Sequence, residues 1–438
     1  MPSAGVSERG ALQDVARVLT GGESTFRNAK LQSSTLVAYK AIADLAGKSS
    51  LFFVTILAAR RLSPWAFGVF GLGTTLGWIL AVATDFGVQM HLARAVARTP
   101  DHASALLRRW WRARTMSAAA GLFVLAAVLV LLRVNVQLAV PLFLFAVVYS
   151  VTGLLELVNY FYRGLSRSDI ESTLTIWQRS AALALGVGAL LWRPDVTTLA
   201  IALLLPVVGA LAWSLWRARA MRPAVVPSTP PADSFFRDVF PIGVGIVFSA
   251  LYFRIDVLLV ELWAGTEAVA GYNAVFRLID ALRLFPAAVL AVALPALCRA
   301  DDLMPLARVS AAVTAFAVVA AAALWVAAGA LVPMLYGARY LSAVPAFRIL
   351  ALTFPLLSLN FALTHQLVGW NRQRAYAVVC GAALAANVAL NAWLIPAWSI
   401  DGAAWATLGT ELCVTSGCLV ALGALGAPGA PVVTSSPA

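Results

Sequence analysis

The sequence has few charged residues and few side chains that ligate metals or form disulfides. Charged residues make up 12% of its 438 residues, and it has only four cysteines and three histidines. The cysteines lie in or beside apolar stretches without the paired spacing of a zinc site, so we interpret them as packing residues. The scattered histidines exclude a histidine-rich metal site. We therefore expect neither a metal centre nor a disulfide framework.

Apolar residues dominate what is present. Hydrophobic side chains make up 61% of the chain, and the mean hydropathy is +0.85, far outside the range of soluble globular proteins. Residues 1–35 lack the apolar core of a secretory signal, so the first apolar stretch must serve as the insertion signal. This composition predicts a membrane protein.

Apolar stretches of about 20 residues, the length that crosses a hydrocarbon core of about 30 Å, recur about twelve times. They cover approximately residues 36–59, 65–92, 116–132, 137–162, 170–192, 196–216, 235–263, 268–297, 307–331, 344–370, 375–398 and 402–424. We predict an all-α polytopic membrane protein with two six-helix lobes. Its parts are a cytoplasmic segment 1–35, a lobe 36–216, a proline-rich cytoplasmic linker 217–234, a lobe 235–424 and a disordered tail 425–438.

The positive charge is distributed unevenly between alternate loops. Twenty Lys and Arg side chains gather on one side of the predicted spans, including residues 9–30 and 94–114, and only six gather on the other. Positive loops stay in the cytoplasm, so both termini are predicted to be cytoplasmic. The net charge of +12 then reflects topology and attraction to anionic lipid headgroups, and we do not expect nucleic-acid binding.

Eleven charged side chains lie inside the predicted spans. Each costs about 2.5–3.5 kcal/mol at the centre of a bilayer, so together they must face one another or a water-filled cavity. They are Lys40, Asp44, Lys48, Asp85, Glu156, Arg179, Arg254, Asp256, Arg277, Asp280 and Arg283. A wet, charged cavity between helices is where a polar substrate would cross, so we expect a transporter.

Several of these charges repeat at helical spacing. Lys40, Asp44 and Lys48 recur every four residues and share one helix face, although a stripe that reaches water at the cytoplasmic end is an alternative. Glu156 and Arg179 are interpreted as a structural pair within the first half. We interpret this face, with Lys40, Asp44 and Lys48, as facing the cavity because Lys48 lies deepest in its span.

The second half holds the densest group. Arg254 and Asp256 lie in mid-span, and Arg277, Asp280 and Arg283 follow one another at intervals of three in the next span. These three form either part of a cavity wall or a purely structural ladder of ion pairs.

Several short motifs follow one another in a defined order along the chain. They are Phe67-Gly68-Val69-Phe70 and Asp85-Phe86-Gly87 in the first half, and Tyr252-Phe253-Arg254-Ile255-Asp256, Ala270-Gly271-Tyr272-Asn273-Ala274, Phe285-Pro286, Leu335-Tyr336-Gly337 and Asn387-Val388-Ala389-Leu390-Asn391 in the second. In this order they resemble the polysaccharide flippases, the Wzx-like oligosaccharide translocases. That family belongs to the multidrug/oligosaccharidyl-lipid/polysaccharide (MOP) superfamily, with the MATE exporters and the peptidoglycan lipid flippases. The resemblance covers nearly the whole chain beyond residue 35.

The resemblance implies a bacterial inner-membrane protein with two lobes around a V-shaped cavity lined by helices one, two, seven and eight. The implied activity is alternating-access transfer of a polyprenyl-(pyro)phosphate-linked oligosaccharide across the cytoplasmic membrane for cell-surface polysaccharide biosynthesis. Implied partners are this lipid-linked oligosaccharide, membrane lipids, and a polysaccharide polymerase or glycosyltransferases of the same pathway.

The charged residues suggest how such a substrate would be held. The candidate phosphate-binding residues are Lys40, Lys48, Arg254, Arg277 and Arg283. The candidate carboxylates that hold these bases in the empty cavity are Asp44, Asp85, Asp256 and Asp280. One of the four is also a candidate to bind a proton or Na⁺ for coupling, and no other cofactor is expected.

Three alternatives differ in what they require. A MATE-like cation-coupled exporter of small molecules would need a carboxylate-dominated cavity, whereas this set has at least as many bases as acids. A membrane enzyme would need a large extracytoplasmic loop with catalytic groups, but the loops are short and no His, Asp and Glu cluster there. A non-transporting scaffold would leave the buried charges unexplained. We expect no catalytic residues.

Overall fold

The computed structural model describes residues 47, 49–221, 235–299, 303–370 and 372–425. Almost all of these residues are α-helical, and no β-strand occurs among them. The predicted N-terminal segment, most of the predicted linker and most of the predicted tail lie outside the described residues. So do Lys40, Asp44 and Lys48.

The first half consists of antiparallel helices joined by short turns. After a first helix whose described part ends at residue 61, these are α2 (Pro64–Asp85), α3 (Val88–Arg98), the 3₁₀ turn η1 (Pro100–His102), α4 (Ala103–Leu131), α5 (Val136–Gly164), α6 (Ser168–Trp192) and α7 (Val196–Ala220). The residues at the helix ends explain where the helices begin and end. At α2, the Ser63 hydroxyl accepts a hydrogen bond from the Ala66 N–H at 3.2 Å and Pro64 occupies the first helical position.

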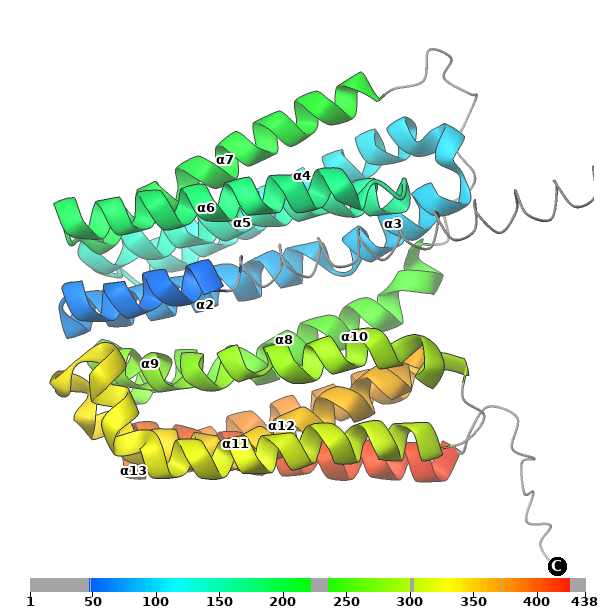
Figure 1. The fold of residues 1–438 in the computed structure, drawn as a ribbon. Coiled ribbons are helices and arrows are strands. Elements are labelled where there is room, and N and C mark those ends of the chain that lie inside the picture. Colours follow the sequence, from blue (N-terminus) through cyan, green and yellow to red (C-terminus); the bar gives the residue numbers. More distant parts are fainter. Residues whose placement is uncertain (1–46, 48, 222–234, 300–302, 371, 426–438) are drawn as a thin grey trace, which may run out of the picture.

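The second half repeats this arrangement. Its elements are α8 (Phe235–Ala264), α9 (Thr266–Leu282), α10 (Leu284–Arg299), α11 (Met304–Tyr336), the 3₁₀ segment η2 (Ala338–Ala343), α12 (Val344–Gly369) and α13 (Gln373–Leu425). The segment α13 is two helices that meet at Ser399, where φ is 50°. Figure 1 shows α2–α7 and α8–α13 as two bundles lying one against the other.

The described residues include nine helices that are long and apolar enough to cross a membrane, with α13 counted once. The helices α9 and α10 are too short to qualify separately, yet they follow one another as one interrupted span. The prediction of an all-α polytopic membrane protein is confirmed.

Two predicted spans are interrupted at corresponding positions of the two halves. Residues 65–92 and 268–297 were each predicted as one helix, but the first breaks between Asp85 and Val88 and the second at Arg283. At the first break, Phe86 and Gly87 adopt positive φ angles of 46° and 83°. The apolar composition continues across the break at Arg283, so hydropathy does not reveal it, whereas α3 after the first break carries Gln89, His91, Arg94 and Arg98. Interrupted helices in corresponding positions of two halves often mark the binding site of a transporter.

The two halves pack most closely where α2 and α9 begin. A Cβ added to Gly68 would overlap the carbonyl oxygen of Thr266, and one added to Gly71 would lie 2.8 Å from Nδ2 of Asn273. Small residues allow helix backbones to approach this closely. The glycines on α2 therefore set the distance between the two bundles at this end.

At the end where α2 and α9 begin, two arginines form hydrogen bonds between the halves, one from each half. Arg60, at the end of the first helix, donates hydrogen bonds to the carbonyl oxygens of Leu335 at 2.7 Å and of Met334, which close α11. In return, Arg339 donates to the carbonyl oxygen of Ala59 at the end of the first helix. Each guanidinium thus meets the negative end of a helix dipole in the other half. Charge distribution predicts that this end faces away from the cytoplasm.

The halves also touch at the opposite end of α2. The Phe86 ring lies 5.7 Å from that of Phe240, and a Cβ added to Gly243 would lie 2.6 Å from the Phe86 ring. The space between these two contact regions holds the cavity described next.

Candidate substrate-binding cavity

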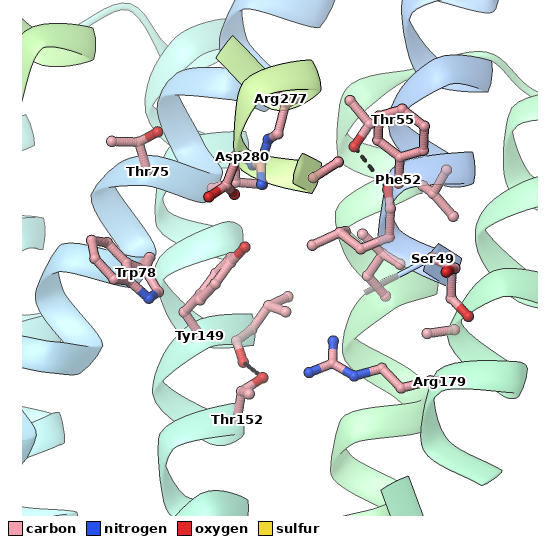
Figure 2. A pocket seen from close by; sticks show the side chains of 18 of the residues that line it. Ser49, Phe52, Thr55, Thr75, Trp78, Tyr149, Thr152, Arg179, Arg277 and Asp280 are labelled. Atoms are coloured by element: carbon pink, nitrogen blue, oxygen red, sulfur yellow. Dashed lines mark hydrogen bonds between the residues drawn. The ribbon is translucent and has the colours of Figure 1, made fainter. Parts of the chain in front are cut away.

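A cavity of about 500 Å³ lies between the two halves (Figure 2). Its wall includes residues of the first helix and of α2, α5, α6 and α7 from the first half, and of α8, α9, α10 and α12 from the second. The helices expected to line it, one, two, seven and eight, all contribute described residues. The helices α5 and α6 also contribute, which the sequence did not indicate.

The described part of this wall is strongly cationic. Four arginines line it, Arg179, Arg254, Arg277 and Arg283, against one carboxylate, Asp280. Arg254 is only 5% exposed, whereas the other three are partly exposed. The sequence predicted three of the four arginines as substrate ligands, and the structure brings those three to one side of one cavity.

Two of the arginines have hydrogen-bonding capacity to spare. Neither Nη1 of Arg254 nor Nε of Arg277 has a hydrogen-bond partner among the described residues. The guanidinium of Arg254 lies 4.6 Å from the centre of the Phe276 ring, and Nη2 of Arg277 donates to the Thr74 hydroxyl at 3.2 Å. Aromatic faces stabilise a buried cation without consuming its N–H donors. The donors stay available for an anion.

Arg283 stands at the break between α9 and α10. Its Nη1 lies 3.6 Å from the Asp280 carboxylate, and its guanidinium lies 4.1 Å from the centre of the Phe253 ring. The sequence suggested ion pairs among Arg277, Asp280 and Arg283, and the structure contains the pair between Asp280 and Arg283. Arg277 instead hydrogen-bonds the other half of the molecule.

The closest partners of Asp85 and Asp256 are groups other than the cavity arginines, contrary to expectation. Asp85 lies 3.6 Å from Nε of Arg114, and Asp256 accepts hydrogen bonds from the Tyr272 hydroxyl and the Val257 N–H. Neither carboxylate is part of the described cavity wall. Both are placed by packing within one half, which spacing along the sequence does not reveal.

Arg114 was counted with the cytoplasmic loop charges, but it is fully buried in α4. It donates to the Thr84 hydroxyl at 2.9 Å and to the Ala81 carbonyl at 3.1 Å, so it caps the last turn of α2. The sequence predicts an apolar run that begins at residue 116, whereas α4 begins at Ala103. The sequence carries a signal, because Leu106, Trp110 and Ala118 are apolar and Arg114 stands in their register of every four positions, on the face that α4 buries.

Arg179 was interpreted as the structural partner of Glu156, but it reaches into the cavity from α6 (Figure 2). The carboxylate of Glu156 lies 3.9 Å from Nη2 of Arg163 instead. The signal for Arg179 was its position in mid-span, where a charge needs a wet or anionic neighbour.

The candidates in the first helix, Lys40, Asp44 and Lys48, stay predictions because they lie outside the described residues. Among the residues that are described, no group of three or more His, Cys, Asp and Glu side chains is arranged to hold a metal ion.

A family model described as polysaccharide biosynthesis protein matches residues 37–301 of this chain. A search of curated proteins gives no significant match.

Solved structures of low sequence identity share the fold. An inward-facing multidrug resistance MATE family transporter of the MOP superfamily is 15% identical, over 88% of this chain and 95% of its own, with a TM-score of 0.67. A MOP superfamily transporter from Pyrococcus furiosus, described as having a binding pocket of reverse polarity, is 15% identical over 88% and 94%, with a TM-score of 0.66. The lipid II flippase MurJ in an inward closed conformation is 12% identical over 90% and 87%, with a TM-score of 0.64. At these identities the likeness establishes the fold of MOP superfamily transporters.

Proposed function

The chain belongs to the polysaccharide biosynthesis protein family, and from this premise we propose that it is a flippase for polyprenyl-(pyro)phosphate-linked oligosaccharide. The substrate would cross the cytoplasmic membrane by alternating access between the two halves. The observation that carries the proposal is the cationic cavity between them, with Arg254, Arg277 and Arg283 on one wall.

The chemistry of the cavity suits a phosphate group in transit. Guanidinium groups form charge-assisted, bidentate hydrogen bonds with phosphate oxygens, and these strengthen where water is partly excluded. A pyrophosphate would supply partners for the free Nη1 of Arg254 and Nε of Arg277. The polyprenyl tail would stay in lipid, so only the polar headgroup needs to enter a cavity of about 500 Å³.

Export of organic cations is a weaker proposal for this chain. A cation site should be rich in carboxylates, but the described wall has one carboxylate and four arginines. The Pyrococcus furiosus relative is described as having a pocket of reverse polarity and a different function, so the MOP fold is not confined to one pocket charge.

Coupling belongs to the same proposal. Asp280 is the one carboxylate on the described wall, and it faces Arg283 at 3.6 Å. A phosphate that arrives at Arg283 would compete with Asp280 for this cation and place two anions side by side. We propose that Asp280 then takes up a proton or Na⁺, which would tie ion movement to substrate movement.

Location and partners complete the proposal. The chain would lie in the bacterial inner membrane with both termini in the cytoplasm. There it would receive lipid-linked oligosaccharide from glycosyltransferases of its pathway and deliver it to a polymerase on the outer side.

Export in cells tests the proposal. In a deletion strain, Arg254→Ala and Arg277→Ala should each fail to restore surface polysaccharide, while lipid-linked oligosaccharide accumulates as in the empty-vector strain. Arg193→Ala, an exposed arginine at the end of α6, serves as the matched control and should restore export fully. Wild-type export from both cavity variants, at wild-type protein abundance, would refute the cavity role.

A further inference from the structure

The two walls of the cavity differ in chemistry. The described residues that the second half contributes are arginines, Asp280 and apolar side chains, with no hydroxyl or amide among them. The described residues of the first half contribute one arginine and all of the neutral polar side chains of the wall. These include Ser49, Ser50, Thr55, Thr75, Thr152 and Gln178. A ligand with one anionic end and one hydroxyl-rich end fits this division.

Two amphipathic aromatic side chains stand on the first-half wall. Trp78 comes from α2 and Tyr149 from α5, and both are partly exposed. In Figure 2 both lie below Arg277, with Tyr149 between Arg277 and Arg179 in this view and Trp78 to the left. The Trp78 ring packs edge-on against Phe253 at 6.3 Å, which fixes its orientation. Rigid aromatic faces with a polar tip suit the apolar face and hydroxyl edge of a sugar ring.

The hydroxyl groups near this aromatic pair are able to bind a sugar. Thr75 is 2% exposed, and its Oγ1 has no hydrogen-bond partner among the described residues. It precedes Trp78 by three positions on α2, so the two share a helix face. Thr152 donates to the Val148 carbonyl at 2.7 Å, which leaves its oxygen free to accept.

We propose that this first-half wall is a sugar subsite, in which Trp78, Tyr149 and Thr75 bind the sugar residue adjacent to the phosphate. The inference rests on the proposed function, because Arg254 and Arg277 must hold the phosphate for the sugar to reach this wall. The two halves then divide recognition: the second half reads the lipid phosphate that all such carriers share, and the first half reads the glycan.

A purely structural role for Trp78 has to be separated from this one, because its contact with Phe253 joins the two halves. A structural defect would weaken the binding of every ligand, whereas loss of a sugar subsite affects only ligands that carry a sugar. The test therefore compares two probes on the same purified full-length protein.

The probes are farnesyl diphosphate and farnesyl diphosphate bearing one glucose or one N-acetylglucosamine, with affinities measured by calorimetry in detergent. Wild type should bind at least one glycosylated probe more tightly than the bare one. Trp78→Ala should weaken that glycosylated probe about tenfold, and Thr75→Val about three- to tenfold, with the bare probe unchanged. Trp177→Ala removes a tryptophan that is 72% exposed on α6 and should change neither affinity.

Arg277→Ala should weaken both probes equally. Trp78→Phe, which keeps a ring at this position, should retain most of the affinity for the glycosylated probe and guards against a Trp78→Ala variant that fails to fold.

The outcomes separate the two proposals. Equal weakening of both probes by Trp78→Ala, or no preference of wild type for any sugar, would overturn the sugar subsite while leaving the phosphate site intact. Failure of Arg277→Ala to weaken the bare probe, or no binding of either probe by folded wild type, would overturn the proposed function and the subsite with it.

Discussion

Individual arginine residues have two separate roles within the membrane-spanning helices. Arg254 and Arg277 face a cavity with donors unsatisfied, whereas Arg114 is buried beside Asp85 and caps α2. Breaking a buried pair by removing one partner typically costs about 3–5 kcal/mol, because the other charge loses its compensation. The two roles therefore predict different consequences of substitution.

Replacing Arg114 with Ala should lower the thermal unfolding temperature of the purified protein strongly, because Asp85, the Ala81 carbonyl and the Thr84 hydroxyl lose their partner. Gly153→Ala should act in the same direction by about 1–3 kcal/mol, since its Cβ would meet Nη2 of Arg114 at 2.5 Å. Gly188→Ala is the matched control: nothing lies within 4 Å of the added Cβ, and Ala favours the helix. An unfolding temperature for Gly153→Ala equal to that of Gly188→Ala would contradict this account.

Many individual residues of the site were predictable from the sequence, and what could not be predicted has a physical cause. The cost of a charge in lipid singled out Arg254, Arg277 and Arg283, and all three line the cavity, although their role in binding stays a prediction. Asp256 was singled out by the same argument, but its partner Tyr272 is set by the packing of α8 against α9. Energetic cost identifies a buried charge, and only the fold identifies its partner.

At the scale of elements, hydropathy predicted where helices lie but not where they break. Within the described residues, length and apolarity located the spans, with α4 beginning earlier than residue 116 because a helix continues through polar residues such as Arg108 and Arg112. The break at Phe86–Gly87 depends on positive φ angles, to which a hydropathy window is insensitive. Arg283 keeps αR angles, and only the helix assignment is interrupted there.

The close approach of α2 and α9 gives a test at this scale. Gly68→Ala should force the two helices apart, because the added Cβ would overlap the Thr266 carbonyl oxygen. In a cysteine-free background, a cysteine in place of the fully buried Asn273 should then react with a membrane-impermeant thiol reagent added from outside. The same cysteine should stay protected in the parent protein and with Gly209→Ala, where the added Cβ meets nothing within 4 Å. Equal protection in all three backgrounds would show that this contact does not set the separation.

At the scale of the whole molecule, the reciprocal arginine contacts join the halves at the end predicted to face outward. Removing both, with Arg60→Ala and Arg339→Ala, should shift the population toward an open outer end, because the terminal carbonyls of the first helix and of α11 would lose their cross-half partners. Spin–spin distances between labels on the two halves at that end should lengthen. Arg61→Ala changes the exposed neighbour and should leave the distances unchanged. Identical distance distributions for the double variant and wild type would exclude a role in closure.

Whole-molecule architecture was predicted well from the sequence, because it follows from the number and length of apolar spans and from the order of short motifs. The sequence does not reveal which chemical groups lie on which wall, since Thr75, Trp78 and Arg179 line the same cavity as Arg277 only after the two halves pack together.

The most direct test of the central claim is transfer of lipid-linked oligosaccharide by purified protein in sealed liposomes, followed by the accessibility of the glycan to an external enzyme. Wild type and Arg193→Ala should transfer the substrate at similar rates. The double variant with Arg254→Ala and Arg277→Ala should transfer it at least tenfold more slowly, which corresponds to an activation barrier higher by about 1.4 kcal/mol or more. Transfer at the wild-type rate by the double variant, with equal reconstitution, would contradict the account.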